Sequence, residues 1–353
     1  MQYWDRRQID DIRRGFYSAV YFNRTKQILL KEGTTTSVVM QLFQKQAQSV
    51  LCGIDELKVL FELGSGYFAN RKWIDKHDTV RIESLADGDV VNPFETVAHI
   101  TGPYVYSAHL ESLYLGILAR RTLVATNTRR VVRAAQKKPV LFFADRFDDF
   151  QNQAGDGYAA TVGGAAAVCT PAQATHINGI PIGTIPHALI AVNHGDTVKT
   201  AKLFAKHFPK ERLTVLVDFD NDCVHTSLAV ANQLGKKLWA IRIDTSEKII
   251  DRSLLPSKKT EDYGVNPKLV RLVRKALDDH GHTHVQIAVS GGFTAEKISR
   301  FEKEQTPVDM YGVGSALLKG NNDFTADIVK VDNRLISKQG RKYKPNPRLQ
   351  KLL

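Results

Sequence analysis

The spacing of apolar and polar residues changes near residue 138 of the chain. Beyond this point, short runs of β-branched and aromatic residues alternate with segments whose apolar residues recur at helical spacing. The runs that predict strands are 139–144, 181–186, 213–219, 238–244, 285–291 and 308–314. The segments that predict helices are 157–168, 196–208, 223–235, 266–281 and 294–304. Nearly all residues of the strand segments are apolar, as in strands buried on both faces, so we expect a parallel sheet with helical crossovers.

The residues before this point indicate a mixed α/β region. Apolar residues at roughly helical spacing predict a helix over 36–51, and a long helix is expected over 107–135. Strands are predicted at 79–84 and 96–102, on either side of a turn-rich segment with an Asp-Gly pair. A length of 353 residues fits two domains, or one barrel with an attached domain. The six strand segments suit either a barrel or an open doubly wound sheet.

Composition is that of a globular protein without membrane segments. Hydrophobic residues make up 43% of the chain and charged residues 24%. No apolar run approaches the roughly 20 residues that cross a bilayer, and residues 1–16 lack the apolar core of a signal peptide. We therefore expect a cytoplasmic protein. The three cysteines are far apart in the sequence and match no metal-ligand spacing, so we expect reduced thiols and no structural zinc.

Net charge is the one unusual bulk property. The chain has 49 Lys and Arg residues against 37 Asp and Glu residues, a formal charge of +12. Residues 331–353 hold seven of these cations and one acid, which indicates an extended basic tail over the surface. A basic chain can bind nucleic acid or anionic small molecules. Because no RNA-binding signature or helix-turn-helix pattern accompanies the charge, nucleic-acid binding remains the less favoured hypothesis.

Two consecutive strands end in glycine loops, "VSGGF" and "YGVGS". Each has the order strand, glycines, hydroxyl residue, helix. Glycine lets backbone N–H groups approach an anion closely, and a following helix N-terminus adds its dipole. In barrels of alternating strands and helices, the loops after the last two strands often hold phosphate. The pair therefore predicts a phosphate cradle formed by Gly291, Gly292, Gly312, Gly314 and Ser315.

Charged and polar side chains follow the other strand segments. They are Asp145 and Arg146, then Thr184 and His187, then Asp218 and Asp220, and finally Arg242 and Asp244. A single Asp in such a place is commonly a helix cap. Charge or glycine at so many strand ends instead indicates a site at the mouth of the sheet. Arginines suit anions, and carboxylates suit hydroxyls or a metal ion, so the set fits a phosphorylated sugar with an acidic co-substrate.

In this order, the motifs resemble those of the nicotinate phosphoribosyltransferases. These belong to the type II phosphoribosyltransferases, with the nicotinamide and quinolinate enzymes. The similar segments are "AVYFNRTKQIL", "PFETVAHITGPY", "FFADR", "GTIPHA", "VLVDF", "IRIDTS", "SGGF" and "GVGS". The most specific is "GTIPHA", which is similar to the family's Gly-Thr-x-x-His segment.

The resemblance implies a fold and a reaction. The expected fold is α/β, with an N-terminal α/β sandwich domain over 1–110, joined by the tail 331–353, and a barrel-like catalytic domain over 111–330. The expected reaction joins nicotinate to 5-phosphoribosyl-1-pyrophosphate, giving nicotinate mononucleotide and pyrophosphate for NAD biosynthesis. ATP hydrolysis through a phosphohistidine accompanies it, with Mg²⁺. A homodimer with shared active sites is also implied.

The resemblance also assigns roles to residues. His187 is similar to the phosphohistidine, and Asp218 to the carboxylate that orients it. Thr184 and Arg242 resemble contacts of the nicotinate carboxylate.

The remaining roles concern the ring, the sugar and the phosphates. Tyr21 resembles the aromatic residue that stacks on the pyridine from the neighbouring subunit, and Phe143 the one on its other face. Arg146 is expected near the phosphates, and Asp244 at the ribose hydroxyls or Mg²⁺. The glycine loops with Ser315 are expected to bind the 5′-phosphate.

Two departures and several alternatives bear on these expectations. The chain has "FFADRF" where the family commonly shows a segment like FG-x-R-R, so one glycine and one arginine are missing. No cysteine follows Cys223, so the metal knuckle of some relatives is not expected. A quinolinate or nicotinamide phosphoribosyltransferase is the nearest alternative. A basic nucleic-acid-binding protein and a relative that only binds nucleotide are the others.

Overall fold

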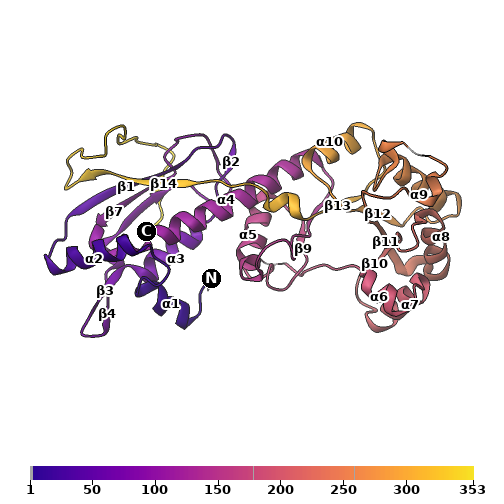
Figure 1. The fold of residues 1–353 in the computed structure, drawn as a ribbon, viewed down its shortest axis with the longest axis horizontal. Coiled ribbons are helices and arrows are strands. Elements are labelled where there is room, and N and C mark those ends of the chain that lie inside the picture. The colour runs from indigo at the N-terminus through magenta and orange to yellow at the C-terminus, as the bar shows by residue number, and fades with distance from the viewer. Residues whose placement is uncertain (1–2, 178, 258) are drawn as a thin grey trace. The chain divides into compact units, whose positions relative to one another are not determined.

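The computed structural model describes residues 3–177, 179–257 and 259–353, and it divides into two compact units (Figure 1). The first unit comprises Met1–Thr126 and Gly320–Leu353, and the second comprises Asn127–Lys319. The helix α4 (Glu111–Ala134) begins in the first unit and ends in the second.

The first unit is built on a five-stranded antiparallel sheet. Its elements are α1 (Arg6–Arg13), α2 (Val20–Lys31), β1 (Ser37–Gln44), β2 (Ser49–Val50), α3 (Ile54–Gly64), β3 (Gly66–Ala69), β4 (Lys72–Asp75), β5 (Arg81–Ser84), β6 (Val90–Val91), β7 (Ala98–Pro103), β14 (Phe324–Val331) and β15 (Gln350–Lys351). The strand order is β14-β1-β7-β5-β15, and the pairs β2-β6 and β3-β4 form separate small sheets. The predicted strands at 79–84 and 96–102 are confirmed as β5 and β7.

The helix predicted over 36–51 is wrong. This segment forms β1 and the short β2, and β1 pairs with β14 over 38–44 and with β7 over 37–42. Most of β1 is buried, so its apolar residues reflect packing inside the sheet and not one face of a helix. The β-branched Val38 and Val39 fit an extended strand better than a helix.

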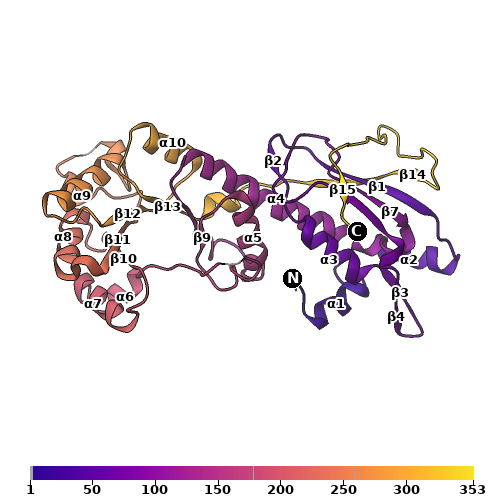
Figure 2. The same cartoon turned by 180° about the vertical axis from the view of Figure 1, so that it is seen from behind.

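The C-terminal tail belongs to the first unit, where it contains β15 (labelled in Figure 2). β15 pairs antiparallel with β5. The Gln41 side chain accepts a hydrogen bond of 2.7 Å from the backbone N–H of Lys344. The ring of Tyr343 stacks on His99, with 4.9 Å between centroids. Leu349, Leu352 and Leu353 pack against the core. The basic tail is thus held by contacts of its backbone and apolar residues, together with ion pairs of Arg341 with Asp327 and of Arg348 with Glu95.

The second unit carries a curled sheet of six parallel strands. Its strands are β8 (Val140–Phe142), β9 (Ala167–Val168), β10 (Leu213–Leu216), β11 (Leu238–Ile243), β12 (Gln286–Val289) and β13 (Met310–Val313). The helices are α5 (Gln153–Gly163), α6 (His187–Val192), α7 (Thr197–His207), α8 (Cys223–Leu234), α9 (Pro267–Asp279) and α10 (Ala295–Lys303). The strand order is β10-β11-β12-β13-β8-β9. Helices such as α8 and α9 lie outside the strands (Figure 1), so the α/β fold with a barrel-like domain is confirmed.

The sheet stays open, and one extended segment bridges its two edges. Ile182 donates its backbone N–H to Val168 of the edge strand β9, at 2.9 Å. Ile185 donates to Thr214 of the other edge strand, β10, at 3.1 Å. The predicted strand 181–186 is therefore wrong, because its hydrogen bonds go to different strands and form no ladder. Pro181 and Pro186 bound the segment, and proline lacks the N–H that a ladder needs.

The remaining expectations for this unit hold in the main. Five of the six predicted strands contain the observed β8, β10, β11, β12 and β13. The helix predicted over 157–168 ends earlier, at Gly163, because Gly164 adopts a left-handed conformation with φ of +103°. The residues that follow form the short strand β9 instead of more helix.

Candidate active site

A cavity of about 570 Å³ opens where the strands of the second unit end at their carboxyl termini. All of its lining residues belong to the second unit. Every site residue predicted from the sequence lines this cavity except Tyr21, Asp218 and Asp220. Residues as far apart in the sequence as Phe143 and Ser315 therefore meet in one pocket.

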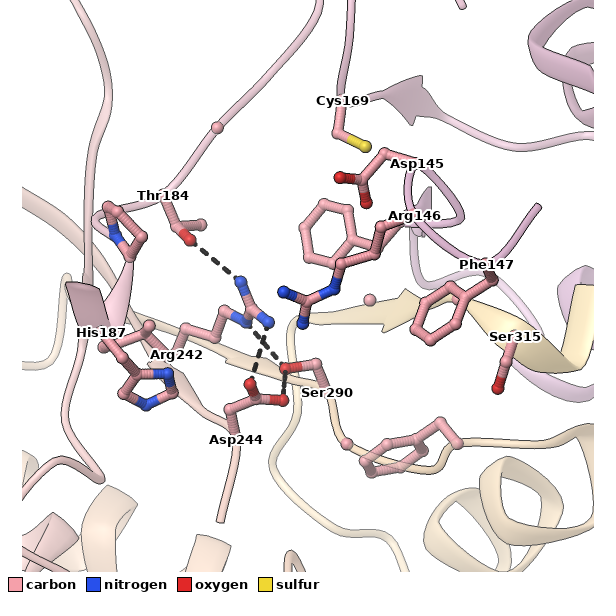
Figure 3. A pocket seen from close by; sticks show the side chains of 18 of the residues that line it. Asp145, Arg146, Phe147, Cys169, Thr184, His187, Arg242, Asp244, Ser290 and Ser315 are labelled. Atoms are coloured by element: carbon pink, nitrogen blue, oxygen red, sulfur yellow. Dashed lines mark hydrogen bonds and ion pairs between the residues drawn. The ribbon is translucent and has the colours of Figure 1, made fainter. Parts of the chain in front are cut away.

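Arg242 lies at the centre of a hydrogen-bonded group in the pocket (Figure 3). Its Nε donates to Ser290 Oγ at 2.7 Å, its Nη1 to Thr184 Oγ1 at 3.0 Å and its Nη2 to Asp244 Oδ2 at 3.2 Å. Ser290 Oγ in turn donates to Asp244 Oδ1 at 2.6 Å. A guanidinium has five N–H donors. Among the described residues three donors are used, which leaves one N–H on each terminal nitrogen, as bidentate binding of a carboxylate requires.

The Phe143 ring forms an aromatic wall beside this guanidinium. Arg242 Cζ lies 5.0 Å from the ring centroid. The backbone N–H of Phe143 donates to Val313 at 2.8 Å, which extends the pairing of β8 with β13 by one residue. A Cβ on Gly312 would come within 2.5 Å of the Phe143 ring. Any side chain larger than that of glycine at this position would therefore force the Phe143 ring or the strand to move.

His187 forms the second polar group, at the first residue of α6. Its Nε2 lies 3.0 Å from Asp218 Oδ2. The Asp218 side chain is only 7% exposed and that of His187 is 42% exposed. The hydrogen bond to Asp218 is the main cause of a raised pKa of His187, which burial opposes. Asp218 Oδ1 is buried and makes no hydrogen bond to any described residue.

The two glycine loops contribute backbone to the pocket. Gly291 and Gly292 adopt left-handed conformations, with φ of +86° and +64°. Thr294 caps α10 by accepting a hydrogen bond of 3.3 Å from the N–H of Lys297. In the second loop, a Cβ on Gly314 would lie 2.5 Å from the Phe147 ring. A larger residue at Gly292 or Gly314 would therefore displace a neighbouring side chain.

Sequence reasoning assigned no role to Ser290 or Cys169, and it named Asp145 only as a charged residue at a strand end. Ser290 links Arg242 to Asp244, and its position before the paired glycines is the signal that could have found it. Cys169 and Asp145 line the cavity together, and burial with the nearby carboxylate raises the pKa of the Cys169 thiol to about 12. Cys169 is therefore a protonated, weakly reactive thiol.

Tyr21 is a residue of α2 in the first unit and takes no part in lining the pocket. Tyr21 is 63% exposed, and the neighbouring apolar residues Val20 and Ile28 are exposed to a similar degree.

Two features are absent from the part of the chain that the structure describes. No helix in this part is both long enough and apolar enough to cross a membrane. Over the same ranges, no group of three or more His, Cys, Asp or Glu side chains is placed to hold a metal ion.

Comparison with known proteins places this geometry in a family. Residues 19–122 match the family described as "Quinolinate phosphoribosyl transferase, N-terminal domain". A nicotinate phosphoribosyltransferase of Mycobacterium tuberculosis is 31% identical over 277 residues, which cover 75% of this chain and 57% of that protein. The corresponding protein of Bacillus subtilis is 24% identical, over 67% of this chain and 45% of its own length. The chain thus spans about half the length of these relatives.

Solved structures agree over nearly the whole chain. A nicotinate-nucleotide pyrophosphorylase from Pyrococcus furiosus is 30% identical with a TM-score of 0.80, covering 94% of this chain and 79% of that one. Human nicotinic acid phosphoribosyltransferase shares the fold, with a TM-score of 0.72 at 14% identity over 93% of this chain and 77% of that one. The chain therefore belongs to the type II phosphoribosyltransferases, the family of the nicotinate and quinolinate enzymes.

Proposed function

We propose that the protein is a nicotinate phosphoribosyltransferase that makes nicotinate mononucleotide for NAD biosynthesis. The observation that carries the proposal is the pairing of Arg242 with Phe143 beside two glycine loops. The two spare N–H groups of Arg242 suit one carboxylate, and the Phe143 ring suits one face of a pyridine. The loops suit the phosphate of a sugar phosphate.

The reaction follows from this arrangement. The pyridine nitrogen attacks the anomeric carbon of 5-phosphoribosyl-1-pyrophosphate, a C–N bond forms, and the C–O bond to pyrophosphate breaks. Arg242 and Phe143 orient the ring, while the loops hold the 5′-phosphate at the other end of the sugar. Holding both reactants in place removes much of the entropic barrier to their reaction. Asp244, which fixes Arg242, also faces the pocket as an acceptor for ribose hydroxyls.

We further propose that ATP phosphorylates His187. An ionised Asp218 can only accept, so Nε2 carries the proton in their hydrogen bond and Nδ1 of the neutral ring keeps its lone pair. Nδ1 attacks the γ-phosphorus, and ADP leaves with the electrons of the broken P–O bond. Asp218 stabilises the positive charge that develops on the ring.

Mg²⁺ is proposed as the cation that accompanies the phosphates. Asp145 and Asp244 supply carboxylate oxygens to the pocket, the ligand type that Mg²⁺ prefers. Bound there, Mg²⁺ would offset the negative charge of the pyrophosphate group. Because Asp244 already accepts hydrogen bonds from Arg242 and Ser290, its main role is to hold Arg242 in place.

A homodimer with shared active sites is the proposed assembly. Tyr21 is exposed on the first unit, whereas the pocket is lined entirely by the second unit. We propose that Tyr21 of the partner subunit covers the face of the pyridine opposite Phe143.

Quinolinate is the second candidate substrate, because residues 19–122 match the quinolinate family description. Quinolinate carries two adjacent carboxylates, and each needs a cationic partner. Arg242 and Arg146 are the arginines that line the pocket, and no lysine lines it among the described residues. Since Arg146 is expected at the phosphates, one guanidinium is left for the ring, which favours nicotinate.

One assay tests the proposed function. Purified protein is incubated with labelled nicotinate, 5-phosphoribosyl-1-pyrophosphate and Mg²⁺, with and without ATP. Nicotinate mononucleotide and pyrophosphate are expected in both cases, at a higher rate with ATP. Parallel reactions with quinolinate and nicotinamide are expected to be much slower. Product from quinolinate in place of nicotinate would contradict the assignment.

A further inference from the structure

Lys297 lies behind the first glycine loop, on the side away from the pocket described above. It belongs to the first turn of α10, and its side chain is 23% exposed. Its Nζ donates a hydrogen bond of 3.1 Å to the carbonyl oxygen of Gly291. The same Nζ lies 4.5 Å from the centroid of the Phe293 ring, which holds the ammonium under the loop.

The loop separates two cavities. Gly291 and Gly292 line the pocket that contains Arg242. Lys297 lines a second, more open cavity of about 820 Å³, together with Glu247 and Arg300. The carbonyl of Gly291 therefore points to the side of the second cavity, because it accepts its hydrogen bond from Lys297.

The direction of the Gly291 carbonyl determines the direction of the Gly292 N–H, because the two groups belong to the same peptide bond. A trans peptide is planar, so the carbonyl of one residue and the N–H of the next point in opposite directions. The bond between Gly291 and Gly292 is trans. When Lys297 holds the Gly291 carbonyl on its own side, the N–H of Gly292 is directed to the other side, toward the pocket. Both residues are glycines with positive φ, and without a Cβ their backbone can adopt many other conformations unless a contact such as that of Lys297 holds it.

The Lys297 ammonium also lies beside a carboxylate, that of Glu247, whose negative charge it partly offsets. The Glu247 carboxylate lies 3.9 Å from Lys297 Nζ and against Gly292, where a Cβ would overlap Glu247 Oε1. An anion so close to the loop would repel a bound phosphate. The Glu247 side chain is 65% exposed, so solvent screens most of this charge and the hydrogen bond to Gly291 is the stronger effect.

We propose that Lys297 is a positioning residue for sugar-phosphate binding, which presets the N–H of Gly292 as an anion donor without touching the substrate. The proposal rests on the proposed function for the identity of the full substrate. It makes Lys297 specific for the phosphate end of the site, because its contacts lie on the glycine loop and none of them involves Arg242 or Phe143.

The test compares Lys297→Met, Lys297→Arg and Glu247→Gln with the exposed Lys303→Met on the same helix as control. Methionine keeps the length and apolar stem of the side chain but cannot donate. Because a charge-assisted hydrogen bond is lost, we expect Lys297→Met to raise the KM for 5-phosphoribosyl-1-pyrophosphate about tenfold or more. The kcat and the KM for nicotinate should change less than about threefold, on the reasoning that uniform binding energy affects KM alone. Arginine should restore most of the affinity, and Lys303→Met and Glu247→Gln should resemble the wild type.

Binding of ribose 5-phosphate, measured by calorimetry, tests the proposal without any turnover. Lys297→Met should weaken this binding by the same factor, while Tm shows that the variant is folded. Unchanged affinity for both sugar phosphates would overturn the proposal. An equal loss of nicotinate and sugar-phosphate affinity would overturn it too, since Lys297 would then support the whole pocket. If wild-type protein makes no nicotinate mononucleotide, the proposed function fails, and ribose 5-phosphate binding still decides the role of Lys297.

Discussion

His187 Nε2 and Asp218 Oδ2 are 3.0 Å apart, and the carboxylate is almost fully buried beneath a half-exposed imidazole. This arrangement fixes which ring nitrogen carries the proton and leaves the other nitrogen for chemistry. It also raises the pKa of His187, chiefly through the hydrogen bond to Asp218, with Asp244 acting in the same direction and burial and Arg242 opposing.

Asp218→Asn should lower the pKa of His187. The amide oxygen can still accept from Nε2, so the geometry survives while the negative charge is lost. Phosphorylation requires the neutral ring, so its rate should fall as pH drops through the folded pKa, and this midpoint should move to lower pH in the variant. An NMR titration of the histidine resonances measures the shift, with the other histidines as internal references. An unchanged midpoint for His187 would show that Asp218 does not control it.

The sign for stability is the reverse of that for phosphorylation. Because the folded pKa is raised, the pair contributes stability at pH below the ordinary histidine value of about 6.5. The contribution is lost as pH rises through the folded pKa. Asp218→Asn should therefore reduce Tm more at pH 5.5 than at pH 8.5.

His187→Ala should abolish ATP hydrolysis and the stimulation by ATP. Slow synthesis of nicotinate mononucleotide without ATP should remain, because the glycine loops and Arg242 do not depend on the imidazole. Incubation with γ-labelled ATP, followed by acid-labile phosphate analysis, should label the wild type and leave the variant unlabelled. A variant that keeps its ATP stimulation would show that His187 is only a turn residue at the start of α6.

The sequence predicted which residues line the pocket better than it predicted the backbone elements that place them there. His187, Arg242 and Asp244 could be found because charged residues recur at or near the ends of the predicted strand segments, although Arg242 lies within β11 and the segment before His187 forms no strand. The local pattern did not reveal that 181–186 bridges two strand edges, because an apolar run between prolines resembles a strand. The same limit applies to β1, whose apolar residues are buried by neighbours from the other end of the chain.

Contacts between residues far apart in the sequence cannot be predicted from any local sequence pattern. Ser290 and Lys297 lie next to the paired glycines, which are recognisable in the sequence. The role of Ser290 depends on its contacts with Arg242 and Asp244, and that of Lys297 on the direction of the Gly291 carbonyl. The first contact joins residues about 50 positions apart in the sequence, and the second depends on the orientation of a single peptide plane.

Arg242→Ala should raise the KM for nicotinate far more than that for 5-phosphoribosyl-1-pyrophosphate. Truncating one partner of a buried charged pair costs about 2–5 kcal/mol, so we expect an effect of about 30-fold or more. Discrimination between nicotinate and nicotinamide should fall by a comparable factor, measured as the ratio of kcat/KM. The exposed Arg212→Ala is the control. Equal effects on both substrates would count against the assignment of Arg242.

Gly312→Ala should disturb the aromatic wall of the pocket. The added methyl group would lie 2.5 Å from the Phe143 ring, so the ring or the strand must move. Overpacking of this kind costs about 1–3 kcal/mol. We expect a lower Tm and a raised KM for nicotinate. Gly116→Ala is the matched control, because nothing lies within 4 Å of its Cβ position in α4, where alanine favours the helix. A Gly312→Ala variant as stable as the wild type would show that the ring moves freely.

The dimer proposal predicts that two inactive subunits can restore each other. Tyr21→Ala removes the aromatic residue that each subunit is proposed to supply to its partner, and His187→Ala removes the phosphorylated residue of the subunit's own pocket. In a mixed dimer, one site combines the intact pocket of the first variant with Tyr21 of the partner subunit. The other site carries both substitutions. The two variants should each lack ATP-stimulated synthesis alone and regain it when mixed.

The size of the recovery makes this test quantitative. With random exchange of equal amounts, half of the dimers are mixed and each holds one intact site of two, so about a quarter of wild-type ATP-stimulated activity is expected. Exchange is checked by isolating mixed dimers through two different affinity tags. If tagged mixed dimers form but remain inactive, Tyr21 does not act across the interface. The exposed Val20→Ala in place of Tyr21→Ala is the control, because it changes the same helix without removing the aromatic ring.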